Sequence, residues 1–267
     1  MKAIRRTVLH VVVLSLAVIS GCAGVDAPRD PGATQALAPT GKLRVGLYPG
    51  TPTSILGNAA SGNARGVGFD LGQELAQRAG VPFEAVVFPK NAEVIAAAKA
   101  GSVDMVFTNA TPARRNDLDF SPTVLQVELG YLVPAASTIR ALDQIDGTGI
   151  RVGVSEGSTS EATLSREFRN ATVVRVSSLK AGVDLLASGK LEAFATNKAT
   201  LFEMAGELPG SRVLEGRWGL ESFAIGIPKA REKARPLVDS FVGEAKASGA
   251  VARAVERAGL RGTVIPN

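Results

Sequence analysis

The stretch 101–115 (GSVDMVFTNATPARR) joins an apolar run to a polar end that could bind an anion. Its alternating apolar residues predict a short strand. Thr111 followed by Pro112 is typical of a helix N-cap with proline at the first helical position. Arg114 is then the third helical residue, so backbone N–H groups, the positive end of the helix dipole and a guanidinium would converge there on an anion. The alternative is a surface ion pair between Arg114 and Asp117.

A second polar loop, residues 155–161 (SEGSTSE), follows another predicted strand. Ser158 and Glu161 have the spacing of a capping box at the start of a helix. The hydroxyl groups of Ser158 and Thr159 and the free N–H groups of that first turn would form a second polar pocket beyond the strand end. The alternative is capping alone, with no ligand.

The scarcity of histidine and cysteine restricts the chemistry of the chain. His10 and Cys22 are its sole histidine and cysteine. If residues 1–21 are removed as a leader, the mature protein has no histidine and at most one lipidated cysteine. This excludes a Ser-His-Asp triad, a Cys-His pair and a histidine-containing zinc site. We expect no metal or cofactor, whereas chemistry that uses carboxylates alone remains open.

The N-terminal residues 1–21 have the layout of an export signal, with a basic start and then an apolar run over residues 8–19. The run ends at ISGC, which resembles the lipobox of bacterial lipoproteins and implies that Cys22 is lipidated and anchors the protein to a membrane. The alternative is an ordinary cleaved signal with an incidental thiol. Residues 22–40, rich in Ala, Pro, Gly and Asp, are expected to form a flexible tether.

The length of 267 residues favours two lobes over one domain. Hydrophobic residues make up 45% of the chain and charged residues 21%, which is typical of a globular protein with a sizeable core. The formal net charge is +5, but Lys2, Arg5 and Arg6 lie in the leader, which holds no acid. The remainder carries a net charge of +2 and therefore offers no broad electrostatic surface for nucleic acid.

From residue 41 the pattern alternates between predicted strands and helices, which indicates an α/β fold. The spacing predicts strands over residues 42–47, 82–88, 124–133 and 223–227, and helices over residues 91–100, 180–188, 231–247 and 250–258. A further helix contains Leu71, Leu75 and Ala79 at helical spacing and ends at Gly80.

An internal echo suggests two similarly built lobes. Residues 150–154 (IRVGV) repeat 43–47 (LRVGL), and residues 189–197 (GKLEAFATN) repeat 101–109 (GSVDMVFTN) in the same order. Two short matches can also arise by chance. If the lobes do correspond, Asn109 and Asn197 end equivalent strands, and open α/β sheets bind ligands beyond such carboxyl ends.

These blocks, together with GFDLGQELAQRAGV and TPARRNDLDFSP, resemble in order those of the family 3 bacterial solute-binding proteins, the extracytoplasmic receptors of polar amino acid ABC transporters. The resemblance implies a two-lobed, periplasmic-binding-protein-like fold of type II, with a ligand held between the lobes. Two crossover strands would lie near residues 130–135 and 222–228. The first lobe would comprise residues 41–130 and 228–267, and the second lobe residues 135–222.

The resemblance also assigns roles to individual residues. Arg114 would hold the ligand carboxylate, assisted by Asn109 and by Ser158 and Thr159 in the second polar loop. Asn197 stands where the family usually has an acid for the ligand ammonium.

Other positions would complete the cleft. Tyr48 and Thr51 occupy the family's first-loop acid and aromatic positions. We expect Thr108 to orient the ligand and Tyr48 and Trp218 to line the cleft, although a tryptophan is more often a core residue. Three acids could replace the missing ammonium partner: Glu156, Glu128 and Glu221.

The expected protein is a non-enzymatic, monomeric receptor in the periplasm, anchored as a lipoprotein. It would capture a small anionic or zwitterionic solute, an amino acid or related organic acid, and deliver it to an ABC transporter permease. One alternative is a periplasmic dehydratase of cyclohexadienyl acids on the same fold, which would need a carboxylate acid or base in the cleft. Another is a binding protein that presents its solute to a sensor.

Overall fold

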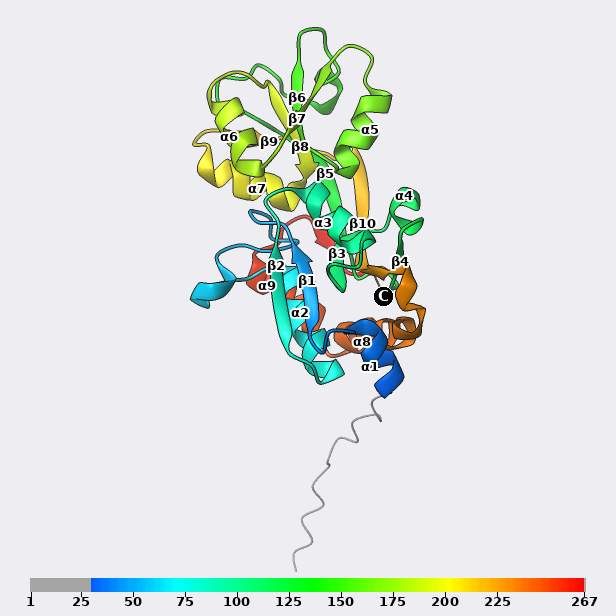
Figure 1. Ribbon diagram of the computed structural model, residues 1–267. Helices are drawn as coiled ribbons and strands as arrows, with labels where there is room; N and C mark the ends of the chain where they lie inside the picture. Colours follow the sequence, from blue (N-terminus) through cyan, green and yellow to red (C-terminus); the bar gives the residue numbers. More distant parts are fainter. Residues whose placement is uncertain (1–29, 267) are drawn as a thin grey trace, which may run out of the picture.

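The computed structural model describes residues 30–266, which fold into two α/β lobes, one above the other in Figure 1. The predicted leader, Cys22 and the first part of the predicted tether lie outside these residues. Within residues 30–266, no helix is both long enough and apolar enough to cross a membrane.

The strands form a mixed sheet in the order β2-β1-β3-β10-β5-β8-β6-β7. Strands β1, β2 and β3 are parallel to one another in the first lobe, and β6, β7 and β8 are parallel in the second. Short strands β4, β9 and β11 pair with β10 or β5. The strand bounds are β1 Leu43–Leu47, β2 Phe83–Val87, β3 Met105–Asn109, β4 Leu118–Phe120, β5 Leu125–Val133, β6 Arg151–Ser155, β7 Thr172–Val176, β8 Ala193–Asn197, β9 Arg212–Val213, β10 Gly219–Pro228 and β11 Thr263–Val264.

The two halves of this sheet have the same plan, which confirms the two-lobed fold suggested by the internal echo. The order β2-β1-β3-β10 corresponds to β7-β6-β8-β5. The echo extends to single contacts: the backbone and guanidinium of Arg44 bind Asp104, and those of Arg151 bind Glu192. In both lobes the arginine also donates to the carbonyl of the glycine three residues before the acid.

Helices cover both lobes, and α2 ends where the sequence places a stop signal. In α2, Leu71 and Leu75 are buried, and Gly80 ends the helix with φ of 72°, a left-handed conformation that glycine adopts without strain. The helix bounds are α1 Pro31–Leu37, α2 Val67–Ala79, α3 Asn91–Lys99, α4 Pro112–Arg115, α5 Thr159–Glu167, α6 Leu179–Ala187, α7 Lys198–Glu207, α8 Arg235–Ala247 and α9 Ala250–Ala258, with short 3-10 helices η1 Ala59–Ser61, η2 Leu142–Gln144 and η3 Lys229–Ala234.

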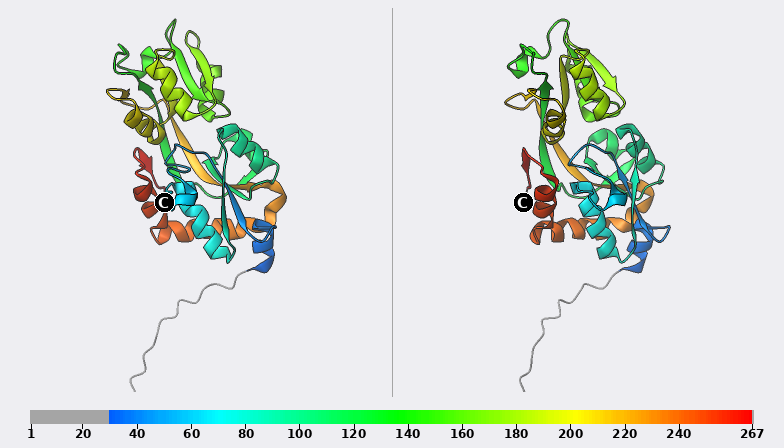
Figure 2. Two further views of the ribbon diagram at one scale, coloured as in Figure 1. Left: turned by 60° about the vertical axis from the view of Figure 1, so that its left-hand side comes forward. Right: turned by 90° about the vertical axis from the view of Figure 1, so that its left-hand side faces the viewer.

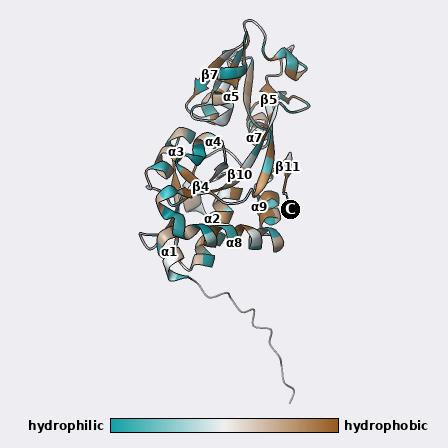
Figure 3. Cartoon of the chain, turned by 90° about the vertical axis from the view of Figure 1, so that its right-hand side faces the viewer, coloured by the Kyte–Doolittle hydropathy of each residue, from teal (hydrophilic) through white to brown (hydrophobic). Residues whose placement is uncertain are grey.

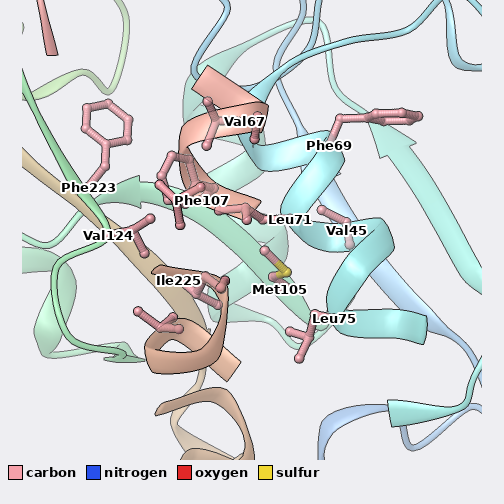
Figure 4. Close-up of a cluster of buried hydrophobic side chains, with 14 of the residues drawn as sticks. Val45, Val67, Phe69, Leu71, Leu75, Met105, Phe107, Val124, Phe223 and Ile225 are labelled. Atoms are coloured by element: carbon pink, nitrogen blue, oxygen red, sulfur yellow. The ribbon is translucent and has the colours of Figure 1, made fainter. Parts of the chain in front are cut away.

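The core of the first lobe lies between α2 and the sheet. Figure 4 shows Leu71 and Leu75 of α2 close to Val45 of β1, Met105 of β3 and Ile225 of β10, and all five side chains are almost fully buried. Burial of each such side chain contributes about 1.5–3 kcal/mol, so this core stabilises the strands that carry the site. In Figure 3 the central strands are mostly hydrophobic and the exposed faces of the helices carry the hydrophilic residues.

The second half of the predicted tether is ordered, so the prediction of a flexible segment over residues 22–40 is wrong there. Helix α1 starts with Asp30 as N-cap, accepting from the Gly32 backbone, and with Pro31 in the first turn. Leu37 is fully buried in the first-lobe core, and its carbonyl accepts from Arg231 at 3.0 Å. A seven-residue helix with two buried positions, Ala33 and Leu37, is too short to show a periodic pattern.

The connection between the lobes is made by two long antiparallel strands, β5 and β10, which run between them in all views (Figures 1 and 2). They pair with each other over residues 125–129 and 219–223. Both crossings therefore begin earlier than the predicted 130–135 and 222–228, because each strand continues from one lobe into the other and Pro134 only marks the end of β5. Helices α8 and α9 pack against α2 of the first lobe.

Candidate functional site

A cavity lies between the lobes where the carboxyl ends of β1, β3, β6 and β8 face one another. Its volume is about 80 Å³. The lining includes Thr108, Asn109 and Arg114 from the end of β3 and from α4, with Ser158, Thr159 and Asn197 from the second lobe. The structure thus brings together seven of the eight predicted ligand contacts, because Tyr48 also lines this cavity.

Arg114 is fixed by the predicted strand-to-helix junction. Thr111 is the N-cap of α4, its hydroxyl accepts from the Arg114 backbone at 3.2 Å, and Pro112 begins the helix. The Arg114 guanidinium folds back toward β3, where Nη1 donates to Thr108 Oγ1 at 2.6 Å and to the Asn109 carbonyl at 3.2 Å. The alternative surface pair with Asp117 is not formed.

Gly157 in the second polar loop touches the opposite lobe. Its carbonyl accepts from Arg114 Nη2 at 3.3 Å and from Asn91 Nδ2 at 3.3 Å. Gly157 has φ of 74°, and a Cβ atom there would lie 2.8 Å from Cβ of Ala92. The lobes are therefore closed on each other at this point, and close approach requires a glycine.

Ser158 caps α5 as predicted, with its hydroxyl accepting from the Glu161 backbone at 3.0 Å. The capping box is modified, because the Glu161 carboxylate accepts from the Gly157 backbone at 2.6 Å instead of from that of Ser158. The Thr159 hydroxyl is directed to a different partner and donates to Glu221 Oε1. This loop therefore both forms the cavity wall and fixes one of its charged groups.

Glu221, on β10, is the acid that reaches the cavity among the three that the sequence left open. Its side chain is buried, with 6% of the residue exposed, and lies near Arg114 and the Asn109 side chain. Burial raises the pKa of Glu221, while its neighbours Thr159, Arg114 and Asn109 act in the opposite direction.

The other two acids are engaged elsewhere. Glu128 binds Lys198 at 2.8 Å and Arg217 at 3.2 Å, and Glu156 lies about half exposed beside Lys90. Burial also lowers the pKa of the Arg114 guanidinium, which remains protonated. Arg114 and Glu221 are the two charged groups of the cavity wall in the described part of the chain.

Asn197 caps α7 and uses its carbonyl oxygen for that purpose. Oδ1 accepts from the backbone N and from the hydroxyl of Thr200, both at 3.0 Å. Thr200 Oγ1 in turn lies 2.7 Å from Thr51 Oγ1, which lies 2.8 Å from Thr53 Oγ1. This chain of hydroxyl groups crosses from the second lobe to the first and gives that side of the cavity a neutral, polar surface.

The two predicted aromatic contacts have different positions. Tyr48 is buried in the cavity wall, and its hydroxyl makes no hydrogen bond of normal geometry within residues 30–266. Burial raises its pKa, so the hydroxyl stays neutral. Trp218 does not line the cavity: it stacks on Tyr131 with ring centroids 5.8 Å apart and donates from Nε1 to the Gly130 carbonyl at 3.0 Å. The structure therefore contradicts the placement of Trp218 in the cleft wall.

Sequence reasoning missed Asn91, Thr53, Ser155 and Thr200, which also line the cavity. Each lies in a loop or at an element terminus, where no periodicity marks its direction. Within residues 30–266 no cluster of three or more acids, histidines or cysteines could hold a metal ion.

Comparisons with known proteins show which family the chain resembles. Residues 43–259 match the model of the bacterial extracellular solute-binding proteins, family 3. The ABC transporter glutamine-binding protein GlnH of Bacillus subtilis (strain 168) is 22% identical over 215 residues, which cover 78% of this chain and 77% of the relative.

Two solved structures illustrate the likeness of fold. The amino acid ABC transporter substrate-binding protein AbpA of Streptococcus pneumoniae, bound to L-arginine, has a TM-score of 0.76 at 20% identity, covering 84% of this chain and 97% of that one. The ancestral amino acid-binding protein AncCDT-1, a precursor of cyclohexadienyl dehydratase, has a TM-score of 0.73 at 22% identity, covering 84% and 98%. These structures confirm the predicted type II fold.

Proposed function

Since the chain belongs to family 3 of the bacterial extracellular solute-binding proteins, we propose that it captures a small amino acid or related organic acid between its lobes and delivers it to an ABC transporter permease. The family places the protein outside the cytoplasmic membrane. Lipid anchoring through Cys22 and the permease as partner are parts of the proposal. The relatives support the solute class, because GlnH is a glutamine-binding protein and AbpA was solved with L-arginine.

The observation that carries the proposal is the position of Arg114. Its guanidinium reaches the cavity from the first lobe and contacts the second lobe through the Gly157 carbonyl. A guanidinium has five N–H donors, and the contacts of Arg114 with Thr108, Asn109 and Gly157 leave donors for a solute carboxylate. A carboxylate bound there would touch both lobes at once and would favour the closed arrangement.

The cavity volume and lining limit the solute. A group the size of a water molecule needs about 10–15 Å³ of cavity volume, so the 80 Å³ cavity holds on the order of five to eight such groups. The hydroxyl groups of Thr51, Thr53 and Thr200 present no charge to a side chain. A small solute with a neutral, polar side chain therefore fits this wall better than a solute with a charged one.

The test is a thermal-shift screen of the twenty L-amino acids and of short organic acids, followed by calorimetry. Binding of a solute to the folded state raises the melting temperature. Arg114→Ala should remove most of this shift, because loss of a charge-assisted contact weakens binding by about tenfold to one hundredfold. Arg115→Ala is the matched control, since Arg115 lies on the same helix but over the Phe120 ring. Full binding by Arg114→Ala would refute the proposal.

A second candidate function is supported by Glu221. A buried carboxyl with a raised pKa in the cavity is the group that a dehydratase of cyclohexadienyl acids would need for acid–base chemistry. Incubation with prephenate and with arogenate distinguishes the two functions. Steady formation of product, lost in Glu221→Gln, would favour the enzyme, whereas binding without turnover favours the receptor.

A further inference from the structure

Among residues 30–266, the cavity wall holds one cation and one anion, Arg114 and Glu221, and its other lining residues are neutral. Each charge is costly to keep away from water unless an opposite charge compensates it. A solute that carries a carboxylate alone would draw Arg114 away and would place a second negative charge near Glu221. A zwitterionic solute compensates both groups, so the charge pattern favours it.

Glu221 also has acceptor capacity for a further donor. A carboxylate has about four lone-pair sites, and the Thr159 hydroxyl and the Asn109 side chain occupy part of them. An ammonium group brings up to three N–H donors. Thr159 belongs to the second lobe and Asn109 to the first, so the carboxylate is fixed from both sides.

Asn197 cannot serve as the acceptor for an ammonium group in this structure. Its Oδ1 has two lone pairs, and both are used by the backbone and hydroxyl of Thr200. The remaining amide nitrogen is a donor. An ammonium group placed beside Asn197 would therefore meet N–H groups and no free acceptor from this side chain.

The neighbouring acid on the other crossover strand is turned away from the cavity. Glu221 lies opposite Val127 in the β10–β5 ladder, and Glu128 lies opposite Leu220. Because consecutive residues of a strand point to opposite faces, Glu128 and Glu221 lie on different faces of the sheet. Glu128 is satisfied on its own face by Lys198 and Arg217.

We propose that Glu221 binds the ammonium group of the solute and thereby selects zwitterionic α-amino acids over the corresponding acids that lack the amino group. This inference rests on the proposed receptor function and assigns its specificity to one residue on the crossover strand. Asn197 caps helix α7 and does not supply the acceptor for the ammonium group. The carboxylate that does so is that of Glu221, which reaches the cavity from β10.

The test uses matched pairs of solutes at neutral pH. Each pair consists of an amino acid and the corresponding acid without the α-amino group. The probes are L-serine with 3-hydroxypropanoate, L-glutamine with glutaramate, and the tightest-binding amino acid of the screen with its own des-amino acid. Calorimetry of the wild-type protein should show the amino acid binding at least tenfold tighter than its partner. In Glu221→Gln the amino acid should bind about tenfold to one hundredfold more weakly, and the partner should bind as well as before or better.

Two further variants separate charge from structure. Glu128→Gln makes the same change on the other face of the sheet and should leave both affinities unchanged. Glu221→Asp keeps the charge and should retain part of the preference. Far-UV circular dichroism of each solute-free variant shows whether it folds. If Glu221→Gln does not fold, Glu221→Asp provides the test, since a preference unchanged from that of the wild-type protein would overturn the inference.

The outcomes distinguish the inference from the function on which it rests. Equal wild-type binding of a solute and its des-amino partner would overturn the role of Glu221 and leave a receptor for organic acids. A preference that survives in Glu221→Gln would also overturn it. If no amino acid and no organic acid binds to the wild-type protein, the receptor function itself fails and the role of Glu221 fails with it.

Discussion

Arg114 and Glu221 reach one cavity from different parts of the fold, and each loses hydration there. Arg114 is fixed by a local motif, in which Thr111 caps the helix and Pro112 starts it. Glu221 is fixed by the pairing of β10 with β5 and by the Thr159 hydroxyl across the cavity. The two charges attract each other within the cavity, and a zwitterionic solute inserted between them would keep an attraction at each of its ends.

Burial of Glu221 predicts a defined pH dependence. Its pKa is raised in the folded protein, so the folded state binds a proton more readily than the unfolded chain. The protonated carboxyl favours folding at low pH, and this contribution is lost as pH rises through the folded-state pKa. The affinity for an ammonium-bearing solute should show the opposite trend and fall as pH decreases through the same window, because a neutral carboxyl attracts the ammonium weakly.

This pH dependence is checked by calorimetry and thermal melts over a series of buffers from acidic to alkaline pH. The affinity for the acid that lacks the amino group should not show this fall as the pH decreases. Glu221→Gln removes the titrating group, so its affinity for the amino acid should be flat over this range. A wild-type affinity that is equally flat would contradict the assignment of the ammonium contact to Glu221.

Local sequence signals determined which site residues could be predicted. Arg114, Asn109 and Ser158 lie at cap or strand-end positions that a few neighbouring residues define. Whether Glu221 reaches the cavity depends on which face of a long strand turns toward it. That orientation is decided by pairing with a strand distant in sequence, so local signals do not predict it. Trp218 was misplaced for a similar reason, because its stacking on Tyr131 is a long-range contact.

At the scale of elements, the strands and helices with a clear period or a glycine stop were predicted closely. Helix α2 shows apolar spacing and a left-handed Gly80, and both halves of the echo form equivalent strands. Helix α1 was not predicted, because a short helix lacks a period. The crossing points of β5 and β10 were predicted too late in the sequence, because a continuous strand carries no mark of the lobe boundary. Packing against distant residues decides both.

The second polar loop leads to a prediction about closure. Gly157→Ala would place a methyl group 2.8 Å from Cβ of Ala92, so the lobes could not close fully. We expect binding of the cognate solute to weaken by about tenfold or more, equivalent to at least about 1.4 kcal/mol. Small-angle X-ray scattering with saturating solute should show a larger radius of gyration than for the wild-type protein.

Gly189→Ala is the matched control for this variant. Gly189 has a similar φ of 67° and lies in the same lobe, but a Cβ atom there meets nothing within 4 Å. Both substitutions should cost about 1–2 kcal/mol of stability through the left-handed backbone conformation. Equal loss of binding in the two variants would show that strain, and not contact between the lobes, causes the effect.

At the scale of the whole molecule, the packing of α1 changes the geometry of the proposed anchor. If residues 22–40 were free, the fully extended chain between anchor and lobe could span about 60 Å or more at about 3.3–3.6 Å per residue. With α1 docked on the first lobe, the connecting residues 22–30 allow at most about 30 Å. The α1 end of the first lobe would therefore stay near the membrane, where a permease can receive the solute.

The anchor is tested by Cys22→Ser in the organism or in an expression host that processes lipoproteins. The wild-type protein should partition with membranes and detergent, because acyl chains on Cys22 and the new N-terminus contribute about 0.8 kcal/mol for each buried CH₂ group. Cys22→Ser should appear in the soluble extracytoplasmic fraction and bind the solute with unchanged affinity, since the described residues that line the cavity all lie between Gly46 and Phe223. Solute-dependent growth should decline in this variant if a short tether to the membrane assists delivery. A Cys22→Ser protein that stays with the membrane fraction would show that something other than a lipid on Cys22 holds the protein there.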